Sequence, residues 1–277
     1  MIGRKPAKPK KVTPKRPMGK VLQSVRQVLQ ITHVSEEEAI WQWGEPRAAA
    51  LPEIIDIGVW NIWKGSGGEK FISEYRRMVA DCHLLLAQEA LLTLKALAQF
   101  APTGYLALHG ATYRRKDGIR DGVMTVSAAT ADGEPQRILC LAPEPLLNTT
   151  KASLVTTYKI ENMDKLLCVV NIHSTLIRSP AMAVRELEQV LSYISHHVGP
   201  ILFAGDFNTF SNAYITEVDR VLASIGLSRV VIEGDPRTTT TALDQIYVRE
   251  IEVLHAKVDI SYQHSDHFPI LARLKLK

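Results

Sequence analysis

Several features that would narrow the class of this protein are missing from its 277 residues. No stretch approaches the roughly 20 consecutive apolar residues that a membrane-spanning helix needs. The basic N-terminus is not followed by the apolar segment of a secretory signal. These absences predict a chain without a membrane span, and we expect it in the cytoplasm.

Cysteine is scarce. The three cysteines, Cys82, Cys140 and Cys168, are an odd number, and their spacing matches no zinc motif. Each lies in or beside an apolar segment of the sequence. We therefore expect buried free thiols in a reducing compartment, and neither disulfides nor a cysteine-bound metal.

Acidic residues are absent from the first 30 positions, which carry nine Lys and Arg. Because the whole chain has a net charge of +4, the remaining residues carry −5. Residues 1–18 are rich in Lys, Arg and Pro and cannot bury a core, so we predict a disordered basic tail. Residues 19–33 have apolar side chains at helical spacing, which predicts a short helix that packs on the domain or lies on a membrane surface. This helix and a linker complete the segment 19–50.

From residue 51 to 277, apolar runs typical of buried strands alternate with helical patterns. We expect strands over 54–62, 83–89, 121–128, 152–160, 165–173, 201–207, 243–248 and 268–276. We expect helices over 69–80, 91–100, 181–197 and 212–225. Adjacent strands with interspersed helices predict one α/β domain, in which two packed sheets are flanked by helices.

Polar residues recur where these expected strands begin or end. Taken singly, each has an ordinary alternative as a turn residue, a helix cap, a surface charge or a core histidine. Together they indicate a site, because strand ends are where sites collect in α/β proteins. Two of them are two residues apart after one strand, and we expect them to share a face of it. The residues are Asn61, Glu89, His173, Asp206, Asn208, Asp244, Asp266 and His267.

This set of side chains is rich in oxygen ligands, includes two histidines and contains no cysteine. Hard oxygen ligands favour Mg²⁺ or Mn²⁺ over Zn²⁺. Histidine can donate to an anion or carry a proton. Hydrolysis of a phosphoester needs this combination, because a cation and hydrogen-bond donors must offset the negative charge of the phosphate before water can attack.

Seven short motifs of the chain follow one another in the order and spacing of the endonuclease/exonuclease/phosphatase superfamily, which the chain resembles from about residue 54 onwards. They are WNI (60–62), QE (88–89), DGVMTVS (121–127), NIH (171–173), GDFN (205–208), LDQIYV (243–248) and SDHFPI (265–270). Within the superfamily the sequence is most similar to the bacterial YafD-like branch. The resemblance implies a DNase I-like, four-layer α/β/β/α sandwich of mainly antiparallel sheets, with its site at one end.

The resemblance also implies roles for the metal-binding side chains. Glu89 would bind the metal ion, Mg²⁺ or Mn²⁺. Asn61 would lie beside it and orient ligands or metal-bound water, and Asp266 would help to hold the ion.

Five further side chains would handle water and phosphate. Asp206 would position or deprotonate the attacking water, and Asn208 would hold the phosphate. His267 would contact a phosphoryl oxygen, oriented by Asp244, as a carboxylate fixes the tautomer of an imidazole. His173 would donate to the phosphate or the leaving group. Abasic-site endonucleases carry a tyrosine at that place, so abasic-site repair is disfavoured.

The substrate class depends on the basic residues of the chain. We interpret residues 109–122 as a loop whose Arg114, Arg115, Lys116 and Arg120 either form a solvated charge run or contact a phosphate backbone. The run RTTTT at 237–241 offers hydroxyl donors or forms a β-rich edge.

With the basic tail, these segments predict a nucleic-acid partner, DNA more than RNA, and a nuclease. The alternative is a phosphodiesterase or phosphatase acting on a lipid or small phosphoester at an anionic membrane. A binding protein without activity is disfavoured, because every expected catalytic residue is present. No feature of the sequence indicates a protein partner.

Overall fold

The computed structural model describes residues 31–141, 143–144, 149–176, 179–235 and 243–277. The expected tail over 1–18, most of the helix expected over 19–33 and the run 237–241 lie outside these residues. Among the helices that the structure describes, none is both long enough and apolar enough to cross a membrane.

The first sheet has eight strands. They are β1 (Thr32–His33), β2 (Ile40–Trp43), β3 (Ile54–Asn61), β4 (Leu84–Gln88), β5 (Leu106–Arg114), β6 (Arg120–Ser127), β13 (Ile251–Val258) and β14 (Ile270–Leu276). Their order is β1-β5-β6-β4-β3-β14-β13, and β2 pairs with β5. Two helices accompany this sheet, α2 (Gly68–Asp81) and the single-turn α3 (Leu97–Phe100), together with the 3-10 turn η1 (Trp63–Gly65).

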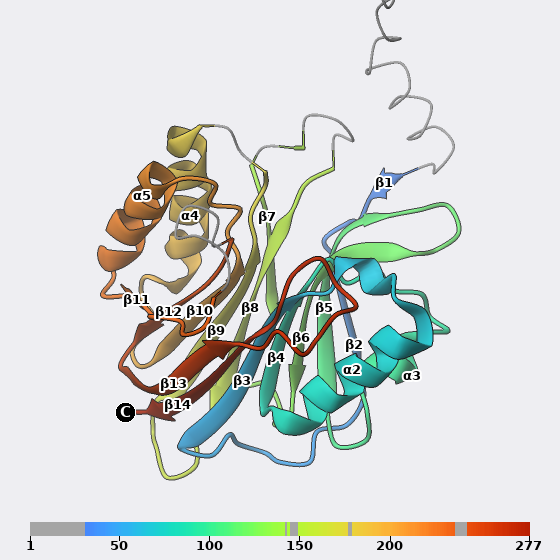
Figure 1. Ribbon diagram of the computed structural model, residues 1–277, viewed down its shortest axis with the longest axis horizontal. Helices are drawn as coiled ribbons and strands as arrows, with labels where there is room; N and C mark the ends of the chain where they lie inside the picture. Colours follow the sequence, from blue (N-terminus) through green and yellow to red (C-terminus); the bar gives the residue numbers. More distant parts are fainter. Residues whose placement is uncertain (1–30, 142, 145–148, 177–178, 236–242) are drawn as a thin grey trace, which may run out of the picture.

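The second sheet has six strands in the order β11-β12-β10-β9-β8-β7. They are β7 (Gln136–Leu139), β8 (Ala152–Lys159), β9 (Leu166–His173), β10 (Ile201–Asp206), β11 (Ser228–Arg229) and β12 (Asp244–Arg249). Helices α4 (Pro180–Ile194) and α5 (Asn212–Ala223) cover its outer face (Figure 1).

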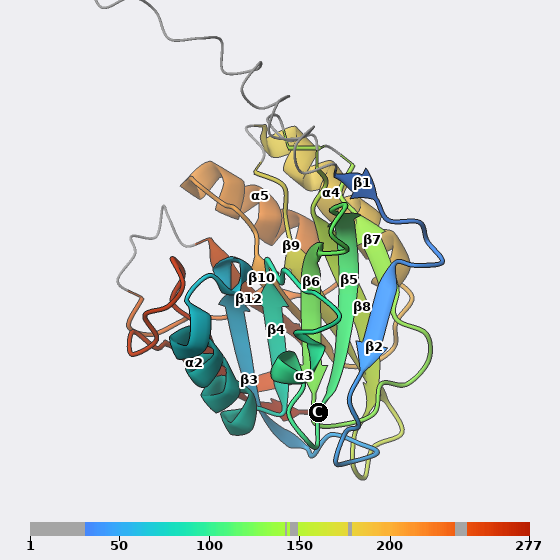
Figure 2. The ribbon, with the colours of Figure 1, turned by 90° about the vertical axis from the view of Figure 1, so that its right-hand side faces the viewer.

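The two sheets pack face to face with helices outside both of them (Figure 1), and Figure 2 looks onto the first sheet from the side of α2 and α3. The pairs β3–β4 and β9–β10 are parallel, whereas the other pairs between the described strands are antiparallel. The expected four-layer α/β/β/α sandwich is therefore confirmed.

Alternation of apolar side chains along the central strands builds the core between the sheets. On β3, Ile55, Ile57 and Val59 are fully buried in this cluster, and on β10 so are Leu202 and Ala204. Residues two apart on a strand project to the same face, so each strand contributes one continuous apolar row. Burying a side chain of the size of Leu or Ile stabilises a fold by about 1.5–3 kcal/mol, which is why these rows fix how the sheets face each other.

Helix α2 shows how the outer layers form. Phe71, Tyr75 and Met78 recur at helical spacing and are buried on the face that packs on the first sheet. The expected helices at 69–80, 181–197 and 212–225 match α2, α4 and α5 within a few residues at each end. The helix expected over 91–100 is wrong in extent, because only Leu97–Phe100 is helical.

The segment expected to be a linker joins the first sheet instead. Strand β2 pairs antiparallel with β5, with Ile40 opposite Gly110 and Trp43 opposite Ala107. The sheet therefore begins well before residue 51. Strand β5 was missed in the sequence because His109 and Gly110 interrupt its apolar run, and both are buried among neighbouring strands.

Cys82, Cys140 and Cys168 are buried and free, as expected. Burial raises the pKa of the Cys168 thiol to about 12, with only a small opposing effect from Arg249. A thiol with so high a pKa stays protonated and unreactive. These cysteines therefore act as small core side chains.

Candidate active site

At one end of the sandwich the inward-facing rows change from apolar to polar. On β10 the row Leu202, Ala204 continues to Asp206, and Asp206 lies opposite His173 of β9 and Asp244 of β12 in the strand register. All three side chains are buried. The register of three adjacent strands thus places two carboxylates and an imidazole in one line, at the end of the inner face.

One group of ligand atoms in the described residues is compact enough to hold a metal ion. It consists of one atom each from Asp206, Asp244 and His267, all within 4.8 Å of one another. Two buried carboxylates side by side repel each other, and a divalent cation between them would relieve that repulsion. The donor chemistry therefore fits a cation that prefers oxygen ligands.

His267 is fixed to both sheets. Its Nδ1 lies 2.8 Å from Oδ2 of Asp244 in the second sheet. The indole Nε1 of Trp60 in the first sheet donates to the backbone oxygen of His267 at 2.9 Å. The hydroxyl of Ser265 donates to the backbone oxygen of Asn61 at 2.6 Å, which holds the same loop against β3. These contacts fix the ring and the loop of His267 between the two sheets.

The pKa values of the two histidines of the site are shifted in opposite directions. Burial lowers the pKa of His267, but the charge of Asp244 and its hydrogen bond outweigh burial and raise that pKa to about 9. Burial lowers the pKa of His173 well below its ordinary value, helped by the positive charges of Lys151 and His267. Near neutral pH, His267 is an imidazolium that donates, and His173 is a neutral ring.

Asp206 lies between these groups. Burial, and then the negative charge of Asp244, raise the pKa of Asp206 to about 7, although His267 and a hydrogen bond from Asn61 act in the opposite direction. The Nε2 atom of His173 is 3.6 Å from Oδ2 of Asp206. A carboxylate whose pKa lies near the working pH can both accept and release a proton.

The two asparagines hold Asp206 from either side. Asn61 donates from Nδ2 to Oδ2 of Asp206 at 3.0 Å, and the backbone N–H of Asn208 donates to Oδ1 at 2.9 Å. The expectation that Asp206 and Asn208 share a strand face is wrong, because β10 ends at Asp206 and Asn208 has a positive φ of 51°. The side chain of Asn208 instead donates to the backbone oxygen of Ser174 at 2.8 Å.

Glu89 and Asp266 lie outside the compact carboxylate group. The carboxylate of Glu89 is 4.0 Å from Nζ of Lys64 and 3.6 Å from Nζ of Lys151. Lys151 also pairs with Glu144 at 3.3 Å. Asp266 is exposed, and the hydroxyl of Ser265 is 3.4 Å from its Oδ1. The expected metal ligands are therefore spread along the site, with Glu89 balanced by two ammonium groups.

Backbone strain concentrates beside these residues. Trp63, Lys64, Glu89 and Asn208 all have positive φ, between 43° and 59°. For residues with a side chain this conformation is unfavourable and persists only where surrounding contacts enforce it. The backbone N–H of Lys64 donates to the backbone oxygen of Glu89 at 3.0 Å, which ties two strained segments together.

The basic residues expected on a loop lie on a hairpin. Residues 109–122 were interpreted as a loop, but β5 extends to Arg114 and β6 begins at Arg120. Arg120 is buried, stacks over the ring of Trp41 at 4.1 Å and donates to the backbone oxygen of Glu38. Its side chain is therefore engaged within the fold.

The other three basic side chains of the hairpin differ in their pairing. Arg114 pairs with Glu38 at 3.2 Å and Arg115 with Asp117 at 2.8 Å. Lys116 is exposed and makes no ion pair within the described part of the chain. Most of the positive charge of this hairpin is thus neutralised by neighbouring carboxylates.

Several buried polar residues near the site lie in the seven sequence motifs but were assigned no role from the sequence. Gln88, Asn171 and Thr125 form a fully buried polar layer beneath it: Gln88 donates from Nε2 to Oδ1 of Asn171 at 2.8 Å, and Asn171 reaches Thr125 at 3.4 Å. Asn171 lies two positions before His173 on β9, and an interrupted apolar alternation is the signal that could have found these residues.

A small polar pocket of about 30 Å³ opens beside His173 and is lined by Lys64, Asp121 and Lys151, among others. Burial lowers the pKa of Lys151, but the charges of Glu144, Asp121 and Glu89 outweigh it and raise that pKa above its ordinary value. Lys151 is therefore a permanent cation at the edge of the site. It lies just before β8, and its position could not be read from the sequence because its partners come from distant segments.

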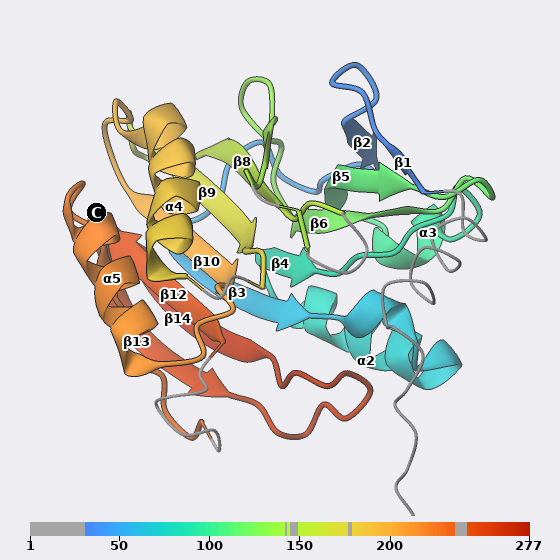
Figure 3. The ribbon, with the colours of Figure 1, turned by 90° about the horizontal axis from the view of Figure 1, so that it is seen from above.

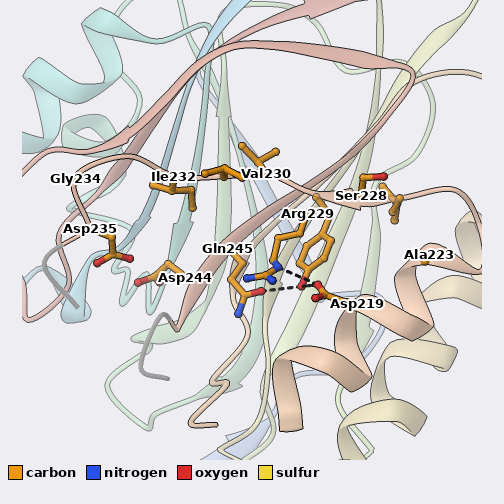
Figure 4. Close-up of a pocket in the computed structure, with 13 residues that line it drawn as sticks. Asp219, Ala223, Ser228, Arg229, Val230, Ile232, Gly234, Asp235, Asp244 and Gln245 are labelled. Carbon is orange, nitrogen blue, oxygen red and sulfur yellow. Dashed lines mark hydrogen bonds and ion pairs between the residues drawn. The ribbon is translucent and has the colours of Figure 1, made fainter. Parts of the chain in front are cut away.

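A separate cavity of about 620 Å³ lies behind Asp244, between α5 and the segment after β11 (Figure 4). Its polar wall is an internal network: Arg229 pairs with Asp219 at 3.0 Å, and the hydroxyl of Tyr247 lies 2.8 Å from the same carboxylate. The two site histidines do not line it. This cavity is therefore beside the carboxylate group and is not the catalytic cleft.

A two-sheet sandwich that gathers carboxylates, amides and one cationic and one neutral histidine at one end defines a phosphoester hydrolase. The Endonuclease/Exonuclease/phosphatase family model matches residues 58–267, and the chain belongs to this family. The matched range contains the polar strand ends from Asn61 to His267.

Solved structures share the fold. An endonuclease/exonuclease/phosphatase from Beutenbergia cavernae has a TM-score of 0.62 at 16% identity, over 80% of this chain and 72% of that chain. The human Nocturnin catalytic domain has a TM-score of 0.58 at 14% identity, over 84% and 100% of the two chains. A mannosyl-6-phosphatase from Bacteroides thetaiotaomicron has a TM-score of 0.59 at 16% identity, over 79% and 99%. Only the last of these names states a substrate, and a shared fold does not define one for this chain.

Proposed function

We propose that this hydrolase cleaves phosphodiesters by water attack with the help of a divalent cation, Mg²⁺ or Mn²⁺. The observation that carries the proposal is the line of Asp206, Asp244 and His173 across three strands, with His267 locked to Asp244. It brings two buried carboxylates, a cationic imidazole and a neutral imidazole to one end of the inner face.

The cation would be held by carboxylates, with Asp206 and Asp244 nearest and Glu89 as a further ligand beside Asn61 and Asp266. Glu89 fits this role because its carboxylate already lies beside two cations, the ammonium groups of Lys64 and Lys151. When bound, such a cation offsets the charge on the phosphate and favours ionisation of water.

The protein side chains would then divide the remaining work. Asp206 would accept the proton of the attacking water, because its pKa lies near neutrality and its position is fixed by two hydrogen bonds. His267 would donate to a phosphoryl oxygen, and Asp244 would keep it charged and oriented. His173, as a neutral ring, would donate to the phosphate or the leaving group. Asn208, held by Ser174, would contact the phosphate.

Nucleic acid is the first candidate substrate, DNA more than RNA. Its support is the N-terminal segment of 30 residues, in which nine Lys and Arg and no acidic residue would bind a polyanion by releasing counterions. The hairpin at Arg114 and Lys116 would add to this surface only weakly, since most of its charge is paired. A second candidate, a lipid phosphodiester, is favoured by the apolar side chains around the site.

A metal-dependence assay across substrates tests the proposal. We expect hydrolysis of at least one of plasmid DNA, single-stranded DNA, RNA, sphingomyelin and inositol phosphates, lost with EDTA and restored by Mg²⁺ or Mn²⁺. Glu89→Gln keeps the shape but removes the charge, so it should raise the metal concentration needed for half-maximal rate and lower kcat.

The matched control is Glu161→Gln. Glu161 is exposed in the turn between β8 and β9, at the end of the sandwich opposite the site. This variant should leave both values unchanged. Full activity in EDTA would refute the role of the cation, and an unchanged metal requirement in Glu89→Gln would remove Glu89 from its ligands.

A further inference from the structure

Six large apolar side chains are exposed on the loops that surround the site. Such side chains need no explanation when they are scattered singly over a surface, but a set gathered at one end of a molecule indicates an interaction surface. We name this set the apolar rim. It consists of Trp63, Leu94, Leu141, Leu176, Phe210 and Ile260.

The strand pairing places the whole rim at the end of the sandwich that carries the site. Trp63, Leu176 and Phe210 follow β3, β9 and β10 within a few residues, on the sides where these strands end in the site. Ile260 lies on the loop from β13 to β14 that also carries His267. Figure 3 views the sandwich from this end.

The two remaining rim residues follow from the same register. Leu94 comes after β4, beyond Glu89. Leu141 lies between β7 and β8, just after Leu139, which pairs with Ala152. The next residue of β8 pairs with Ile172, the neighbour of His173, so Leu141 is at the site end as well. All six rim side chains therefore lie at the end of the sandwich that carries the site.

The opposite end of the described structure is poor in such residues. Among the other exposed large apolar side chains that the structure describes, only Ile54 and Val198 lie at that end. The remaining four lie elsewhere: Met182 and Tyr193 on α4, Val231 after β11 and Leu254 on the edge strand β13.

The basic N-terminal segment, residues 1–30, joins the domain at the end that carries the apolar rim. Thr32 of β1 pairs with Arg114 at the tip of the β5–β6 hairpin, and the bridge from Leu92 to Arg120 sets that tip beside the segment after Glu89. The nine Lys and Arg of residues 1–30 therefore join the domain at the end that carries the site. An apolar rim combined with a basic segment is complementary to an anionic lipid surface.

We propose that this end of the molecule docks on an anionic lipid bilayer, so that a phosphodiester of a lipid headgroup enters the cleft. The proposal rests on the proposed hydrolysis for the reaction and adds the surface on which it takes place. Nucleic acid fits the rim less well, because four of its six side chains are aliphatic and cannot stack on bases.

Vesicle sedimentation tests the docking surface with the full-length protein. The vesicles contain equal parts of phosphatidylcholine and phosphatidylglycerol, and the rim variant combines Leu94→Ser, Phe210→Ser and Ile260→Ser. These side chains are 72%, 47% and 60% exposed, so their loss leaves the core intact. We expect the vesicle affinity to fall by about 100-fold or more, given that burial of one such side chain changes an equilibrium by about tenfold.

The control variant combines Tyr193→Ser, Val198→Ser and Val231→Ser, which are 57%, 78% and 86% exposed but lie away from the rim. It should keep the vesicle affinity of the wild type. Both variants should hydrolyse bis(p-nitrophenyl) phosphate, a soluble diester, at the wild-type rate.

Three outcomes would overturn the docking surface: no binding of the wild type to the vesicles, equal losses in both variants, or a rim variant that loses affinity for single-stranded DNA and keeps it for vesicles. Hydrolysis of the soluble diester tests the proposed reaction independently of vesicle binding. If that reaction fails, the wild type would not hydrolyse the soluble diester with Mg²⁺ or Mn²⁺, whatever its binding to vesicles.

Discussion

The two ends of the inner face are built from the same strands and have opposite chemistry. At one end the inward positions are Ile55 on β3 and Leu202 on β10, both fully buried among apolar neighbours. At the other end the same rows finish with Asn61 and Asp206. The same alternate positions face inward along the whole of each strand, so a site arises where the last inward position of each strand is polar. Stability is concentrated at one end of the rows and chemistry at the other.

The sharpest way to break this comparison is to change both ends of β10. Asp206→Asn should lower kcat by ~10²- to 10⁴-fold, because it removes the proton acceptor. It should also raise the thermal midpoint, since it removes a buried carboxylate that Asp244 repels. Leu202→Ala should cost about 2–5 kcal/mol of unfolding free energy and leave kcat of the folded enzyme near the wild-type value.

Steady-state kinetics and thermal unfolding of the two variants give both readouts. A large loss of stability in Asp206→Asn, or a large loss of kcat in folded Leu202→Ala, would show that the two ends are not separable.

A second test concerns the contact that joins the sheets at the polar end. His267→Ala and Asp244→Asn should each lower kcat by roughly 10²-fold, because the imidazole is lost or loses its orienting carboxylate. The double variant should be no worse than the poorer single variant by more than a small factor. Asp244→Asn should also lower the pKa of His267 from about 9, since the charge of Asp244 is its main cause.

Kinetics of the three variants and an NMR titration of His267 measure these effects. Losses that multiply in the double variant would separate the two residues, as would an unchanged titration of His267.

The predictions made from the sequence succeeded where local pattern and buried rows agree. The eight expected strands all exist because their apolar side chains face a core on one or both sides. Strand β2 and the burial of Arg120 were not predicted, since what fixes them is contact with distant segments: Trp41 lies under the guanidinium of Arg120. Glu89 was expected to face a cation, and the ammonium of Lys151 that meets it comes from the start of another strand. Spacing along the chain cannot reveal such partners.

A third, smaller effect lies outside the inner face, on helix α4. Glu186 is buried, accepts from the thiol of Cys140 at 2.6 Å and from the backbone N–H of Thr175 at 3.2 Å, and also bonds to the side chain of Ser174. It thereby holds the turn that follows His173. Burial is the main cause that raises the pKa of Glu186 from 4.5 to about 7, although its hydrogen bonds oppose the shift.

Because the folded state favours the neutral form of Glu186, its contribution to stability is fully present below pH 4.5 and is lost as the pH rises through about 7. Glu186→Gln stays neutral, so its thermal midpoint should fall less than that of the wild type over this range. Thermal unfolding as a function of pH measures the difference. Parallel curves for the two proteins would show that Glu186 does not titrate on folding.

Strand β14 is the last element of the chain, yet it lies between β3 and β13 in the first sheet. The loop just before it carries His267, and Trp60 holds that loop from the other end of the sequence. Without β14, the edge of β3 would lose its backbone partner and β13 would lose the strand that joins it to the first sheet. The strand that completes this sheet thus also positions the loop of the site histidine.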